Sequence, residues 1–98
     1  MATLHIIAHS PFGDDRLQSC LRLLDIEDAL LLCADAVNAL RIGSVTAAQL
    51  HAAGLDNRLF ALEEDLIARA ISSNQAQAID YSAFVELSIR YDKVNSWL

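Results

Sequence analysis

A short apolar run between acidic segments constrains the fold of this chain more than any other feature. Residues 29–34 read Ala-Leu-Leu-Leu-Cys-Ala, after the polar segment 25–28 and before Asp35. The run is far shorter than the roughly 20 residues that span a membrane. A continuous apolar run of this length is typical of a strand that is buried on both faces, as in a parallel sheet. We therefore expect a buried strand over residues 29–33.

Segments typical of strands and of helices alternate along the chain. The expected strands cover residues 4–8, 29–33, 58–62 and 78–80. The first expected helix begins after Asp14 or Asp15, and the second covers residues 36–40 with Asp35 as its cap. The third begins at Ser44 or Thr46 and ends at His51, before Gly54. The last two cover Glu63 to about Ile71 and residues 81–91. This alternation predicts one α/β domain over residues 1–98, a small, mainly parallel sheet flanked by helices on both faces.

Charge and composition limit the classes of function. The net charge is −6, Lys93 is the single lysine and the six arginines are scattered. Because clustered basic residues supply most of the affinity for phosphates, we expect no direct nucleic-acid binding. A hydrophobic content of 54% excludes disorder, and such an apolar small domain is expected to offer surface to a partner. The first nine residues lack Lys and Arg, so we expect no signal peptide and a cytoplasmic protein without membrane contact.

Known catalytic and ligand-binding motifs do not fit the chain. None of its three glycines forms a dinucleotide or phosphate-binding loop. Its histidines and cysteines lack the spacing of a zinc site, so we expect neither a metal nor a cofactor. A hydrolase built from His9, Ser10 and Asp35 is disfavoured, because Ser10 precedes a proline and has no nucleophile elbow.

Cys20 is the candidate site residue. It lies in the second turn of the helix expected after Asp14 or Asp15, where the helix dipole can lower the pKa of a thiol. Arg16 and Arg22 could help to stabilise the thiolate, the form that attacks a persulfide. Free cysteines are also among the most buried residues, so a purely packing role is the alternative.

Other reactive side chains have simpler interpretations. Cys33 ends the apolar strand and is expected to be inert, while His5 is expected to form a structural hydrogen bond. His9 is interpreted as a loop residue rather than a proton donor to Cys20. The acidic residues 63–65 suit a helix N-terminus better than an acid–base pair. Residues 97–98, Trp-Leu, are expected either to fold back onto the core or to bind a partner.

Four segments resemble the TusB/DsrH family in the same order and at similar spacing. These are residues 4–12, 64–69, 80–87 and 96–98. The resemblance covers nearly the whole chain and implies a DsrE/F-like α/β fold. The chain departs from the family at Ala36 and Ala70, where a glycine is usual. The second departure predicts a helix that extends slightly further than in relatives.

The resemblance also implies a function. It points to a non-stand-alone subunit of a TusBCD-type sulfurtransferase complex, a heterohexamer with TusC/DsrF-type and TusD/DsrE-type sister subunits. That complex relays persulfide sulfur from a TusA-type carrier towards TusE for 2-thiolation of the tRNA wobble uridine. DsrH-like members carry a cysteine where Cys20 stands, which makes Cys20 the candidate persulfide carrier. The alternatives are a DsrH-type subunit of a DsrEFH complex in sulfur oxidation, or a structural subunit without a sulfur-carrying cysteine.

Overall fold

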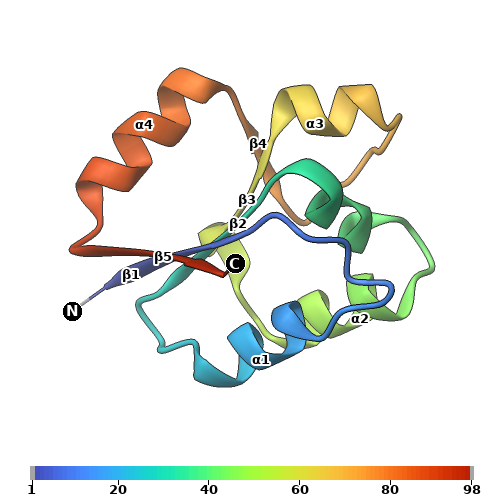
Figure 1. Cartoon of the computed structure of the whole chain (residues 1–98), viewed down its shortest axis with the longest axis horizontal. Coiled ribbons are helices and arrows are strands. Elements are labelled where there is room, and N and C mark those ends of the chain that lie inside the picture. The colour runs from blue at the N-terminus through green and yellow to red at the C-terminus, as the bar shows by residue number, and fades with distance from the viewer. Residues whose placement is uncertain (1, 98) are drawn as a thin grey trace.

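The computed structural model describes residues 2–97 and contains a sheet of five parallel strands (Figure 1). The strands are β1 (Thr3–Ile7), β2 (Ala29–Leu32), β3 (Leu59–Leu62), β4 (Gln77–Ile79) and β5 (Lys93–Trp97). Their order across the sheet is β4-β3-β2-β1-β5. All four residues of β2 are buried, which confirms the interpretation of the apolar run. The strand β5, formed by the tail, was not expected from the sequence.

Apart from the turn η2, which the sequence did not predict, the helices lie close to the expected positions. They are α1 (Arg16–Leu23), the 3-10 helix η1 (Ala34–Leu40), α2 (Val45–Ala52), the 3-10 turn η2 (Asp56–Arg58), α3 (Glu63–Ala68) and α4 (Tyr81–Arg90). Ser44 and Asp80 cap α2 and α4, because their side chains accept hydrogen bonds from backbone N–H groups three residues later. The cap expected at Asp35 is wrong: η1 begins at Ala34, and Asp35 lies within its first turn.

The path of the chain explains which face each helix covers. From β1 to β4 the chain moves across the sheet in one direction, and α4 then returns it to β5 beside β1. Since parallel crossovers are right-handed, this reversal places α4 on the face opposite α1 and α2 (Figure 1). The predicted parallel sheet with helices on both faces is confirmed.

Each face of the sheet has its own core. The larger core includes the side chains of Ile7, Leu17, Cys20, Leu30, Leu32, Val37, Leu40, Leu50, Leu59 and Leu66. The smaller core, under α4, includes Leu4, Leu31, Phe60, Leu62, Ile79 and Leu87. Within residues 2–97, no helix is long and apolar enough to cross a lipid bilayer.

The end of α3 differs from the sequence-based expectation. The helix ends at Ala68, before Ile71, so the predicted extension at Ala70 is wrong. Ala70 adopts a left-handed backbone with φ of 52°. Its N–H donates to the Ile67 carbonyl and the N–H of Ile71 to the Leu66 carbonyl, the hydrogen bonds of a Schellman motif. An alanine thus occupies a position where the backbone favours glycine.

Replacing Ala70 by glycine is expected to stabilise the chain. Glycine reaches the left-handed region without the steric cost of a Cβ atom, which should raise the free energy of unfolding by about 1 kcal/mol. Urea denaturation measures the change. As a control, Ala48→Gly on the exposed side of α2 should lower the free energy of unfolding by a similar amount. Equal effects of the two substitutions would contradict strain at Ala70.

The described part of the tail folds back onto the domain. Trp97 pairs with Ile7 in the β1–β5 register and packs, half-buried, against the larger core. Its indole Nε1 donates a hydrogen bond of 3.1 Å to Nδ1 of His5. Of the two alternatives expected for the tail, Trp97 therefore folds back onto the core and does not extend away from it. Leu98 lies outside the described residues.

Candidate functional site

Cys20 is sealed inside the larger core. It lies on the buried side of α1, next to Leu17 in the same cluster, and its exposed fraction is 0%. Burial raises the pKa of the Cys20 thiol from 9.0 to about 12, and the negative charge of Asp28 adds to the effect. The expectation that the helix dipole and nearby arginines lower this pKa is therefore wrong. In this arrangement the thiol is neutral and unreachable from solvent.

The two arginines near Cys20 in sequence lie in more exposed positions than its thiol. Arg16 forms an ion pair with Asp14 at the start of α1. Arg22 is exposed on the same helix, whereas Cys20 is buried. The position of Cys20 on the first helix was predictable from spacing, but the surroundings of the thiol depend on tertiary contacts.

Cys33 lies at the carboxyl end of the sheet. It follows β2, is half-buried, and its thiol donates a weak hydrogen bond of 3.6 Å to the Ile7 carbonyl. Burial raises the pKa of Cys33, and the carboxylate of Asp65 raises it further. Neither cysteine is therefore poised as a thiolate, in agreement with the expectation that Cys33 is unreactive.

Charged residues at this edge hold the start of η1 in place. The carboxylate of Asp65 accepts a hydrogen bond of 2.8 Å from the N–H of Ala34. Arg69 bridges Asp35 and Asp65, with N···O distances of 2.9 and 3.7 Å. Ala34 itself has a positive φ of 49°. These contacts give Asp65 a structural role at the start of η1, where Arg69 engages the carboxylates of both Asp65 and Asp35.

The loop after β1 does not assemble a hydrolase. The Ser10 hydroxyl accepts a hydrogen bond from the N–H of Phe12, and His9 is exposed on the loop. Asp35 is engaged by Arg69. Among the described residues, no three His, Cys, Asp or Glu side chains lie close enough together to hold a metal ion.

A hydrogen-bond network links β1, the residue directly before β2, and the last residue of β5, and it was only partly visible in the sequence. His5 forms a hydrogen bond of 3.2 Å through Nε2 with Asp28, while its Nδ1 accepts from Trp97. Because an indole nitrogen can only donate, Nδ1 is unprotonated and the Nε2 proton is directed at the carboxylate. The structural role expected for His5 is confirmed. Asp28 was read only as part of a polar break, although an acidic residue directly before an all-apolar strand was a usable signal.

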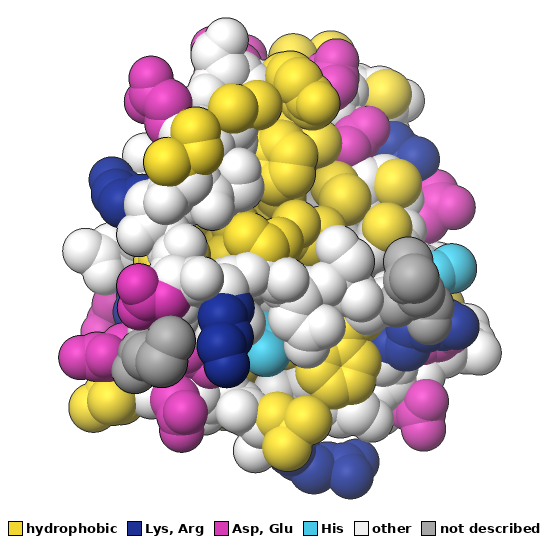
Figure 2. Space-filling view, turned by 60° about the vertical axis from the view of Figure 1, so that its left-hand side comes forward, with side chains coloured by type: hydrophobic (Ala, Val, Ile, Leu, Met, Phe, Trp, Pro, Cys, Tyr) yellow, Lys and Arg dark blue, Asp and Glu magenta, His cyan; other side chains and the backbone are white. Residues whose placement is uncertain are grey.

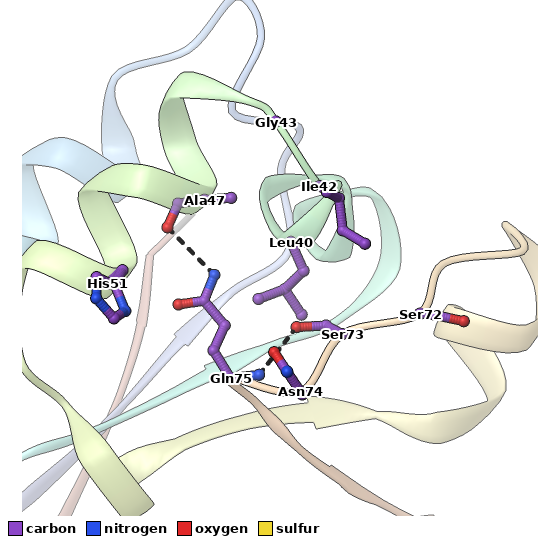
Figure 3. A pocket seen from close by; sticks show the side chains of 9 residues that line it. All are labelled: Leu40, Ile42, Gly43, Ala47, His51, Ser72, Ser73, Asn74 and Gln75. Atoms are coloured by element: carbon purple, nitrogen blue, oxygen red, sulfur yellow. Dashed lines mark hydrogen bonds between the residues drawn. The ribbon is translucent and has the colours of Figure 1, made fainter.

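A cavity of about 580 Å³ opens between α2 and the loop 72–75 (Figure 3). Its polar side includes His51 and Gln75, and Gln75 donates a hydrogen bond of 3.1 Å to the Ala47 carbonyl. Leu40 and Ile42 form its apolar side. The residues that line this cavity include no cysteine and no carboxylate. It therefore offers hydrogen bonds but none of the groups needed for sulfur transfer.

Comparison with known proteins decides the family. The family described as DsrH like protein matches residues 9–94. Protein TusB of Yersinia enterocolitica is 36% identical over 99 residues, covering 96% of this chain and 99% of the relative. Protein TusB of Escherichia coli O81 is 37% identical over 97 residues with the same coverage. The chain belongs to the TusB/DsrH family.

Solved structures agree on the fold of this TusB/DsrH chain. The crystal structure of the ychN protein from E. coli superposes with a TM-score of 0.74, covering 99% of this chain and 100% of the other. Sequence identity is 21%, so this likeness concerns the fold alone. The membership of the TusB/DsrH family that the sequence resemblance implied and the DsrE/F-like fold expected from it are both confirmed.

Proposed function

We propose that this chain is a non-stand-alone subunit of a TusBCD-type sulfur relay that serves 2-thiolation of the tRNA wobble uridine in the cytoplasm. The observation that carries the proposal is the match to proteins named TusB over 96% of the chain. Family membership supports a sulfur relay subunit for tRNA thiolation, and the name TusB favours the relay over sulfur oxidation. The proposed assembly is a heterohexamer with TusC/DsrF-type and TusD/DsrE-type sisters.

The charge of the chain fits this place in the relay. A net charge of −6 without a basic cluster does not favour contact with tRNA. The chain would instead act upstream of the tRNA-modifying step, alongside TusA-type and TusE-type carriers that exchange sulfur with the complex. Partner binding would also stabilise a domain of this size by mass action.

Cys20 remains our candidate for a persulfide carrier, under a condition that the structure sets. The Cys20 thiolate would attack the terminal sulfur of a donor persulfide. A new S–S bond would form on Cys20 while the donor's S–S bond breaks and a donor thiolate leaves, with no net oxidation. Since Cys20 is fully buried with a pKa of about 12, this step requires α1 to move when the complex assembles.

A structural subunit without sulfur transfer is the second candidate, and the burial of Cys20 favours it. In that case Cys20 packs against Leu17 in the larger core, and the sister subunits carry the sulfur. The two candidates differ in one observable, which is whether sulfur is found on this chain within the working complex.

Intact mass spectrometry of the co-expressed complex separates the two candidates. After exposure to a persulfide donor, a carrier gains one reducible sulfur on this chain, and Cys20→Ala abolishes the gain. The matched variant Cys33→Ala should keep it. No gain here together with a gain on a sister subunit would establish the structural role. Failure of the chain to co-purify with either sister would refute the proposed function itself.

A further inference from the structure

The helix α4 carries two lines of apolar side chains, and the fold uses one of them. Leu87, with the partly buried Phe84, faces the smaller core of the sheet. Tyr81, Val85 and Ile89 follow one another at four-residue spacing and are 64%, 40% and 78% exposed. Residues four apart lie along one side of a helix. The three side chains therefore form a line, here called the α4 stripe, that no other part of the described chain covers.

The α4 stripe leads into a hollow between α3 and α4. The hollow has a volume of about 310 Å³ and is lined by Glu63, Glu64, Ile67, Asp80 and Tyr81. Ile67 of α3 is 71% exposed, which extends the apolar surface beyond α4. Figure 2 shows a continuous band of apolar side chains on this side of the molecule, with acidic side chains on both sides of its upper part.

The charges around the hollow are of one sign. Three of the five residues that line it are acidic, and none is Lys or Arg. Glu63 and Glu64 form no ion pair within residues 2–97, and Asp80 uses one oxygen to cap α4. Carboxylates placed beside an exposed apolar line attract a surface of opposite charge and repel an acidic one. A second copy of this chain would bring another net charge of −6 to the contact, which disfavours self-association.

We propose that the α4 stripe is the surface on which a sister subunit binds, through an apolar ridge with Lys or Arg side chains at the end that meets the hollow. The inference rests on the proposed function, because its partner is the sister subunit of the proposed complex that carries this apolar and basic surface. The apolar side chains supply the buried centre of the contact, with Tyr81 as the aromatic anchor. The carboxylates of Glu63, Glu64 and Asp80 set the orientation of the partner.

Binding of the full chain to the purified pair of sister subunits tests the surface. Val85→Glu places a charge in the middle of the α4 stripe and is expected to weaken binding by at least about 30-fold. Arg90→Gln is the matched control, because it changes the net charge equally on an exposed residue of the same helix outside the stripe. Its affinity should stay within about threefold of the unmodified chain. Both residues are exposed, and circular dichroism verifies that both variants are folded.

The carboxylates of Glu63 and Glu64 beside the hollow have a separate test. Glu63→Lys combined with Glu64→Lys is expected to weaken binding and to reduce its dependence on salt, since screening weakens attraction between exposed opposite charges. Tight binding of the unmodified chain with loss in Val85→Glu supports the surface. Equal binding by Val85→Glu and Arg90→Gln overturns the surface and leaves the proposed function standing. No binding of the unmodified chain to the sisters overturns the proposed function and this inference together.

Discussion

Near neutral pH, iodoacetamide is expected to alkylate Cys20 in the folded chain about 1000-fold more slowly than in the unfolded chain. The thiolate is the reacting form, and a rise of the pKa from 9.0 to about 12 lowers its fraction tenfold for each unit. The exposed fraction of 0% slows the reaction further. Measuring the rate by mass spectrometry in a Cys33→Ala background leaves Cys20 as the one thiol of the chain.

The pH dependence of the free energy of unfolding is a second test of the burial and raised pKa of Cys20. A thiol whose pKa is higher in the folded state stabilises the fold below 9.0, and this contribution is lost as the pH rises towards about 12. The free energy of unfolding should therefore fall with rising pH above about 9, and Cys20→Ala should reduce this slope. Alkylation of folded and unfolded chains at rates within tenfold of each other would show that α1 opens readily.

Replacing Asp28 by alanine is expected to be the most destabilising substitution at a polar position of the chain. Its buried carboxylate accepts hydrogen bonds from the N–H groups of Thr3 and Asp25, at 2.9 and 3.0 Å, besides its contact with His5. Removing it leaves the part-buried N–H groups of Thr3 and Asp25 and the buried ring of His5 without their common partner, which should cost about 3 kcal/mol of the free energy of unfolding. Urea denaturation followed by Trp97 fluorescence measures the loss.

A neighbouring variant serves as the control for Asp28. Asp25 is exposed and its side chain has no hydrogen bond within residues 2–97, so Asp25→Ala should change the free energy of unfolding by less than about 0.5 kcal/mol. A comparable loss in both variants would mean that local charge, rather than the buried network, sets the stability.

The dependence of stability on acid pH should report on the same hydrogen-bond network around Asp28. Burial alone would raise the pKa of Asp28, but the N–H groups of Asp25 and Thr3 and the side chain of His5 hold it below its ordinary value. A carboxyl with a lowered pKa stabilises the fold above the ordinary carboxyl range, and this contribution disappears as the pH falls through the lowered value. Asp28→Ala should therefore unfold with a weaker dependence on acid pH than the unmodified chain.

Local sequence was a good guide where local physics decides the outcome. The run 29–34 was long enough for one strand and uniformly apolar, so burial on both faces followed from length and composition. The helix expected from Ser44 or Thr46 is capped by Ser44, and the helix expected over residues 81–91 begins at Tyr81, although its cap, Asp80, was assigned to the preceding strand. The end of α3 was missed because Ala70 adopts a backbone conformation that alanine rarely takes.

The features that the sequence did not predict depend on contacts between distant parts of the chain. The strand β5 has exposed side chains along most of its length, so it lacks the apolar signal that marks β2. His5 meets Asp28 and Trp97 across separations of 23 and 92 positions, which no local pattern encodes. The environment of Cys20 belongs to the same class, since spacing placed it on α1 but could not give its burial or the nearby charge of Asp28.

The pairing of β1 with β5 has a consequence for synthesis in the cell. Thr3 pairs with Lys93, so the first strand to leave the ribosome waits for the last of the five before that edge of the sheet is complete. Until then β1 offers unpaired backbone groups to any other extended chain. A ribosome that stalls before residue 93 would therefore leave a product prone to aggregation, and the nascent chain would profit from a chaperone that shields this edge.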